Sequence, residues 1–170
     1  MRTLVIHPED QSTEFLKQVY VGLPETTVIR DHADASINEM LDLIHESRRI
    51  IMLGHGTPNG LMAVGQFSGS YVIHDGFNWR LKGKPDNIYI WCNADQFVQR
   101  NNLPSDLYSG MFISEVGEAV MMGLDDIEPH QVNQSNHLFA RMLNTALRHD
   151  DMSILKDAYP VAHSNPVVAY

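Results

Sequence analysis

The stretch from residue 49 to residue 56, Arg-Ile-Ile-Met-Leu-Gly-His-Gly, decides the fold that we predict for this chain. After its arginine it is an unbroken apolar run, which is typical of a parallel strand covered on both faces. The run then breaks at two glycines that flank His55. Residues 87–93, Asn-Ile-Tyr-Ile-Trp-Cys-Asn, repeat this design and place Cys92 at the end of a second apolar run. Two such runs indicate buried strands of one mainly parallel sheet.

Short apolar runs alternate with segments of helical period along the rest of the chain, which predicts βαβ units. Strands are expected at residues 3–7, 26–30, 49–53, 87–91 and 110–114. Helices are expected at 12–20, after Ser36, at 116–122 and at 134–148. Between the two quoted runs, residues 61–75 predict a small hairpin around a Gly/Ser-rich turn. We therefore expect an α/β three-layer sandwich with about five strands, as one domain over residues 1–170.

The composition excludes some classes of partner. The chain has 170 residues, of which 44% are hydrophobic, and its formal net charge is −9. A nucleic-acid binder needs a basic patch that displaces counterions from phosphate, and this chain is acidic. We therefore expect neither nucleic acid nor a membrane as a partner, whereas a protein or peptide substrate with cationic side chains fits the charge.

The cysteine count and the apolar segments predict a compartment. A single cysteine excludes an intramolecular disulfide. The apolar run at the N-terminus is too short for a signal peptide, and no stretch approaches the roughly 18 apolar residues that span a bilayer. These features predict a cytoplasmic protein of undetermined oligomeric state.

A histidine and a cysteine at the ends of two strands suggest nucleophilic catalysis. Ligands of open parallel sheets gather beyond the carboxyl ends of the strands, so neighbouring strands would bring His55 and Cys92 to the same edge. A thiol can attack a carbonyl carbon while an imidazole moves the proton. Gly56 lacks a Cβ, so its N–H can approach a developing oxyanion, a contact that contributes about 3–4 kcal/mol in known enzymes.

These residues resemble a known group of enzymes. An apolar strand that ends in His-Gly, followed 37 positions later (92 − 55) by an apolar strand that ends in Cys, is similar to the caspase-like cysteine peptidases of clan CD, which include legumains, gingipains and CHAT-domain proteases. The resemblance implies a cysteine endopeptidase with Cys92 as nucleophile and His55 as proton carrier. It also implies an oxyanion hole from the amides of Gly56 and Cys92, with no cofactor. Trp91 and Asn93 depart from the residues that many relatives place beside the cysteine.

Three further residues are candidates for binding a substrate. Asp95 and Glu115 follow predicted strand ends, where a carboxylate can bind a Lys or Arg side chain. His74, at the end of the predicted hairpin, is a third candidate, and it can alternatively orient His55 or help to line a metal site.

Two alternative functions stay open at this point. The bulky Trp91 beside the cysteine suits a non-catalytic binding module of the same fold. A metal-dependent hydrolase could use His55, His74 and a carboxylate such as Asp75 or Asp95, although a metal site needs three or four converging ligands and the sequence has no HxxxH or CxxC spacing.

Overall fold

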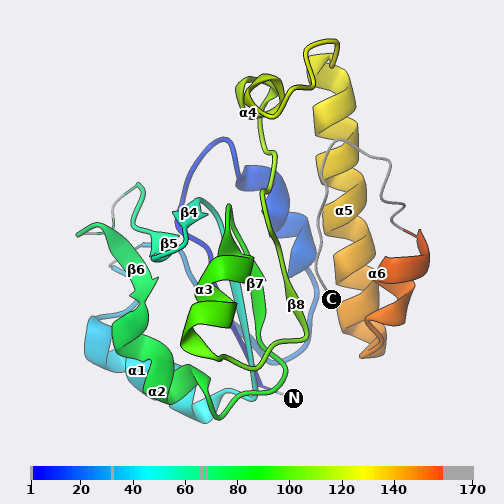
Figure 1. The fold of residues 1–170 in the computed structure, drawn as a ribbon. Coiled ribbons are helices and arrows are strands. Elements are labelled where there is room, and N and C mark those ends of the chain that lie inside the picture. Colours follow the sequence, from blue (N-terminus) through cyan, green and yellow to red (C-terminus); the bar gives the residue numbers. More distant parts are fainter. Residues whose placement is uncertain (1, 32, 66, 68, 159–170) are drawn as a thin grey trace.

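The computed structural model describes residues 2–158 except residues 32, 66 and 68, and its centre is a parallel sheet (Figure 1). Five strands lie in the order β2-β1-β3-β7-β8, and every neighbouring pair is parallel. The strands are β1 Thr3–Ile6, β2 Thr26–Ile29, β3 Arg49–Leu53, β7 Ile88–Ile90 and β8 Leu107–Tyr108. The predicted α/β fold is confirmed, and the central β3 covers the residues that the apolar run predicted.

Helices cover both faces of this sheet (Figure 1). One face carries α1 Ile37–Glu46, α2 Asn78–Leu81 and α3 Ala94–Asn101. The other face carries the 3₁₀ helix η1 Glu14–Val19, the long α5 Pro129–His149 and α6 Ser153–Ala158. Alternate residues of the strands point into these two layers: Met52 and Trp91 join the core under α1 and α3, whereas Ile51 and Ile90 join the core under α5. Burial on both faces explains the unbroken apolar runs.

A small antiparallel sheet follows β3. It consists of β4 Gly56–Thr57, β5 Gly60–Met62 and β6 Tyr71–His74. The short 3₁₀ helix η2 Asp75–Phe77 leads from it into α2. The predicted hairpin is therefore present, and it gains a third strand because the chain pairs with β5 from Gly56 onward.

Local sequence signals set the starts of the helices. The Glu39 amide donates to Ser36 Oγ at 3.3 Å and the Ser36 amide donates to the Glu39 carboxylate at 2.8 Å, which is the capping box that the sequence predicts. The last long helix begins at Pro129, five residues before the predicted start, because proline is favoured in the first turn of a helix.

Two predicted elements differ from the structure. The fifth strand is Leu107–Tyr108, and the predicted strand at 110–114 is wrong, since that segment is a loop that leads to α4 Val116–Met121. Its residues Phe112 and Ile113 are buried by side-chain packing rather than by a strand ladder, and burial of either kind gives an apolar run. The predicted helix at 12–20 begins at Glu14 and is a 3₁₀ helix. Within the described residues, no helix is both long enough and apolar enough to cross a bilayer.

Candidate functional site

The carboxyl ends of β3 and β7 place His55 and Cys92 at the same edge of the sheet. These strands are parallel neighbours, with Leu53 paired to Ile90, and the Gly54 amide donates to the Ile90 carbonyl at 3.0 Å. His55 and Cys92 each follow this pair by two residues. They therefore leave the sheet at the same level as well as at the same edge.

The two side chains also lie on the same face of the sheet. Cys92 packs against the core cluster under η1 and α5. The His55 imidazole contacts Ser12, which lines a cleft beside the first half of α5. The two residues thus share an edge and a side of the sheet, and neither is among the residues that line the cleft.

The thiol of Cys92 has an apolar environment at rest. Cys92 Sγ donates a hydrogen bond to the carbonyl of Phe112 at 3.2 Å, and among the described residues it has no hydrogen bond to His55. Burial raises the pKa of the Cys92 thiol, and the nearby Glu118 carboxylate adds to this effect. The resting cysteine is therefore a neutral thiol.

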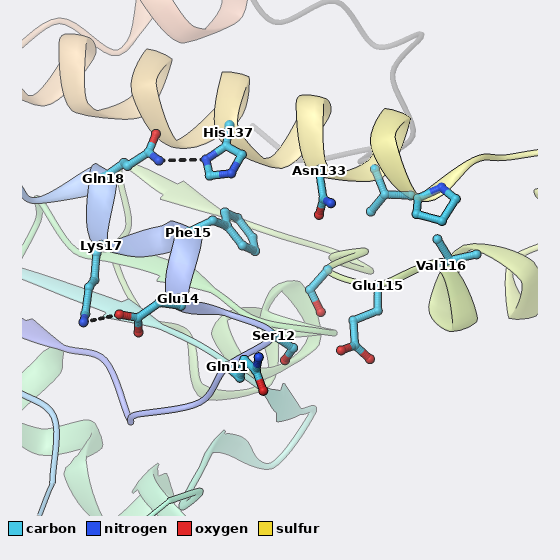
Figure 2. A pocket seen from close by; sticks show the side chains of 13 residues that line it. Gln11, Ser12, Glu14, Phe15, Lys17, Gln18, Glu115, Val116, Asn133 and His137 are labelled. Atoms are coloured by element: carbon cyan, nitrogen blue, oxygen red, sulfur yellow. Dashed lines mark hydrogen bonds and ion pairs between the residues drawn. The ribbon is translucent and has the colours of Figure 1, made fainter.

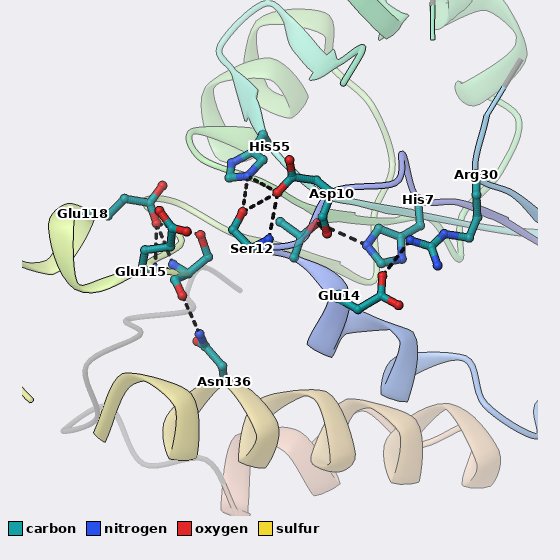
Figure 3. Close-up of polar contacts among 11 residues, drawn as sticks. His7, Asp10, Ser12, Glu14, Arg30, His55, Glu115, Glu118 and Asn136 are labelled. Carbon is teal, nitrogen blue, oxygen red and sulfur yellow. Dashed lines mark hydrogen bonds and ion pairs between the residues drawn. The ribbon is translucent and has the colours of Figure 1, made fainter. Parts of the chain in front are cut away.

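The imidazole of His55 has a polar environment (Figure 3). Its Nε2 lies 2.6 Å from Ser12 Oγ and 3.3 Å from the Asp10 carboxylate, and Ser12 Oγ also donates to Asp10 at 2.5 Å. Burial alone would raise the pKa of Asp10, but the hydrogen bonds from Ser12 and the neighbouring His55 hold it below its ordinary value. Asp10 is therefore a carboxylate that can stabilise a protonated His55.

Sequence reasoning missed Asp10 and Ser12. Both lie in the loop after β1, and β1 is the neighbour of β3 on the side opposite β7. The signal that could have revealed them is topological, because the loop after a central strand meets the loops of its neighbours at the same edge. The sequence shows an Asp-x-Ser motif shortly after the first predicted strand, but it does not show that this strand lies beside the strand that precedes His55.

A buried histidine anchors this loop. His7 Nδ1 lies 3.1 Å from the Tyr20 hydroxyl and Nε2 lies 3.4 Å from Thr13 Oγ1. Burial, and secondarily the Arg30 guanidinium, lower the pKa of His7 to about 4, so the ring is neutral at pH 7. The neutral His7 holds the start of the segment that presents Asp10 and Ser12.

Gly56 is required by packing as well as by any role in a site. A Cβ at Gly56 would lie 2.0 Å from the buried Trp91 ring, whose Nε1 donates to the Thr57 carbonyl at 3.1 Å. The Met62 amide donates to the His55 carbonyl, which makes Gly56 and Leu61 a non-hydrogen-bonded pair of the antiparallel ladder. The Gly56 N–H therefore points away from β5 and is not used by this ladder.

An open cleft of about 830 Å³ lies beside Ser12. Figure 2 shows Ser12 and Phe15 on one wall and Asn133 and His137 of α5 on the other. Glu115, a predicted substrate-binding residue, also lines the cleft, and its side chain is exposed. The other carboxylate in the cleft, Glu14, is already paired with Lys17 and Arg30. Glu115 is therefore the acidic group of the cleft that is best placed for a cationic ligand.

Asp95 and His74, like His55 and Cys92, are not among the residues that line this cleft. Asp95 lies in the first turn of α3, where its amide donates to the Ser109 carbonyl at 2.9 Å. One of its carboxylate oxygens is buried without a hydrogen-bond partner in the part of the chain that the structure describes. His74 is exposed at the end of β6 and packs edge-on against Phe77.

The metal alternative gains no support from the geometry. In the described ranges, no three His, Cys, Asp or Glu side chains come together as a metal-binding group. Asp75 forms an ion pair with Arg100 at 2.9 Å rather than joining His74 and His55 in a shared site.

Comparisons with known proteins leave the site to be judged on its own geometry. The chain matches no protein-family model, no curated protein and no solved structure.

Proposed function

We propose that the chain is a cysteine endopeptidase of the caspase-like kind, with a dyad of His55 and Cys92. The observation that carries the proposal is the pairing of Leu53 with Ile90, which places both residues at one edge of the sheet and at one level. The open cleft beside Ser12 gives further support, because a peptide needs room near the imidazole that Ser12 contacts.

The resting geometry suggests how the proton moves. Because burial keeps the Cys92 thiol neutral, the attack requires a base at the moment of reaction rather than a preformed ion pair. Cys92 Sγ bonds to the scissile carbonyl carbon while its proton passes to His55. The carbon–nitrogen bond then breaks as His55 returns that proton to the leaving amine. Water attacks the resulting thioester, releases the acid and restores the thiol.

Asp10 and Ser12 act on this cycle through His55. The Asp10 carboxylate lies 3.3 Å from the imidazole Nε2, next to the positive charge that the imidazole carries between the two proton transfers. Ser12 holds both groups, since its hydroxyl contacts the imidazole and the carboxylate. These two are positioning residues. The N–H of Gly56, which the β4–β5 ladder leaves unused, is available as an oxyanion donor.

Substrate turnover tests the proposal directly. Fluorogenic peptides with Lys, Arg, Asp or Leu before the scissile bond should be cleaved by the intact chain. Cys92→Ala should abolish turnover, and His55→Ala should lower it by about 10²–10⁴-fold. His74→Ala is the matched control and should retain activity, because His74 is exposed at the end of β6 and packs against Phe77 rather than against His55 or Cys92. A peptidyl acyloxymethyl ketone should label Cys92, as mapped by mass spectrometry. Peptide turnover that persists in Cys92→Ala would contradict the mechanism.

A second candidate, the non-catalytic binding module, is favoured by one observation. The thiol hydrogen of Cys92 is committed to the Phe112 carbonyl within an apolar cluster. A module of this kind would bind its partner equally well after Cys92→Ser and would resist the ketone reagent. Those two results together would replace the peptidase proposal.

A further inference from the structure

The helix α4 and the turn after it expose a cluster of apolar side chains. We define the α4 tip as residues 116–128. Four of its side chains are exposed by more than a third: Val120 45%, Met121 86%, Met122 52% and Leu124 38%. Single exposed apolar residues are ordinary on protein surfaces, but four within five positions form a patch that needs a function.

These side chains have no place in the core because the inner side of α4 is already filled. Ala119 is buried and packs with Ile113 and Val132 in a small separate cluster, which Val116 and Ile127 complete. Figure 1 shows α4 beside the start of α5, at the end of the molecule beyond the sheet. The helix is thus fixed from one side, and its methionines face outward.

The surroundings of this apolar patch are acidic. The α4 tip contains Glu118, Asp125, Asp126 and Glu128, and residues 101–140 include six Asp or Glu and no Lys or Arg. Asp125, Asp126 and Glu128 are exposed. No Lys or Arg of this 40-residue segment offsets these carboxylates, so the patch is an apolar centre with a negative rim.

We propose that the α4 tip binds a basic amphipathic segment of a partner protein. Lys and Arg of such a segment would meet the carboxylates, and its apolar side chains would pack on Met121 and Met122, which are flexible and polarisable enough to adapt to them. Charge complementarity selects this partner. A second copy of the chain would bring two acidic rims together, and an anionic membrane would be repelled by the same rim.

The α4 tip is continuous with the cleft. Glu115 immediately precedes α4, and it lines the cleft together with Val116. A segment that is docked on the α4 tip can therefore continue toward Ser12. This last step rests on the proposed peptidase function, whereas the docking itself does not.

Binding can be measured without any turnover. The probe is the fluorescein-labelled peptide Leu-Lys-Lys-Leu-Leu-Lys-Leu-Leu-Lys-Lys-Leu-Leu-Lys-Leu, and the protein is the full chain with Cys92→Ala. Fluorescence anisotropy should show saturable binding that weakens as salt rises. The same peptide with Glu in place of Lys should not bind.

Matched variants locate the binding on the surface. The double variant Met121→Ser with Met122→Ser should raise the Kd of the probe at least tenfold. Ile37→Ser, which removes a similarly exposed apolar side chain from α1, should leave Kd unchanged. Asp125→Asn should weaken binding more than Asp42→Asn, an exposed carboxylate on α1. Circular dichroism confirms that the variants fold.

Three results would overturn the proposal. One is a Kd that does not change with the methionine substitutions, or that rises equally in the α1 controls, since this would show unspecific charge attraction. Another is a concentration-dependent dimer in sedimentation velocity that Met121→Ser with Met122→Ser dissolves, which would assign the α4 tip to self-association. The third is methionine-dependent binding to phosphatidylserine vesicles. None of these results depends on whether Cys92 is catalytic.

Discussion

The two strand ends that meet at the site differ in chemical character. After β3, His55 lies among polar groups, with Ser12 Oγ at 2.6 Å and the Asp10 carboxylate at 3.3 Å. After β7, Cys92 lies among apolar side chains and donates to the Phe112 carbonyl. The imidazole is thus held by polar contacts, while burial raises the pKa of the thiol. Two residues at equivalent positions after paired strands can therefore have opposite surroundings: His55 contacts the polar Ser12 and Asp10, and Cys92 packs in the apolar core under α5.

The largest expected effect comes from removing the apolar side chain beside Cys92. Phe112 is 2% exposed and packs against Phe139, so Phe112→Ala should lower the free energy of unfolding by about 3–5 kcal/mol. It should also increase the rate at which iodoacetamide modifies Cys92. Urea unfolding and mass spectrometry of the alkylated protein measure the two effects.

The matched control for this experiment lies on the other face of the sheet. Phe97 is fully buried among the rings of Tyr89 and Trp91. Phe97→Ala should cost a similar free energy and leave the alkylation rate at Cys92 unchanged. Equal acceleration in both variants would mean that general loosening, rather than local exposure, governs the reactivity of the thiol.

The free energy of unfolding should fall in acid because of the buried His7, which follows β1. Because the folded state lowers the pKa of His7 from 6.5 to about 4, the unfolded chain binds the proton more readily. Stability from the neutral ring is complete above pH 6.5 and is lost as the pH falls from 6.5 toward 4. The loss should reach about 3 kcal/mol. Urea unfolding of the intact chain and of His7→Gln at pH 7, 5 and 4 measures it, and parallel curves would contradict this role of His7.

The reactivity of the thiol should follow its raised pKa. The alkylation rate of Cys92 in the folded chain should reach its midpoint above the ordinary thiol value of about 8.5. His55→Ala should leave that midpoint in place, because the resting thiol is not paired with the imidazole. A midpoint below pH 7 that disappears in His55→Ala would reveal a preformed ion pair and remove the contrast between the strand ends.

The smallest effect is expected at Ser12. Its hydroxyl is partly exposed, so Ser12→Ala should change the free energy of unfolding by about 1 kcal/mol or less. The exposed Ser70→Ala serves as the reference in the same urea titration. A loss near 3 kcal/mol would show that the Asp10–Ser12–His55 contacts belong to the core rather than to a site.

The apolar runs predicted the sheet well because its strands are buried on both faces. The run at 49–53 matches β3, and the run before Cys92 contains β7. The fifth strand was misplaced at 110–114, since Phe112 and Ile113 are buried in a loop by contacts with distant helices. An apolar run shows that a segment is buried, but it does not show whether the segment is a hydrogen-bonded strand or a loop packed against helices.

The candidate site was only half predictable. His55 and Cys92 follow their own strands, so each could be found from its local sequence. Asp10 and Ser12 depend on the position of β1 beside β3, a tertiary fact that no local pattern contains. Asp95 and His74 stay predictions: Asp95 lies in the first turn of α3, and His74 is exposed at the start of η2.

The contact between Gly56 and Trp91 gives the molecule a built-in optical reporter. Trp91 is fully buried directly below the backbone that follows His55, and it immediately precedes Cys92 in the chain. The other tryptophan, Trp79, is 62% exposed with Arg80 over its ring. In a Trp79→Phe chain all indole emission would come from Trp91. Its wavelength and quenching would then register any movement of the strand ends when a ligand enters, without a label and without a substrate.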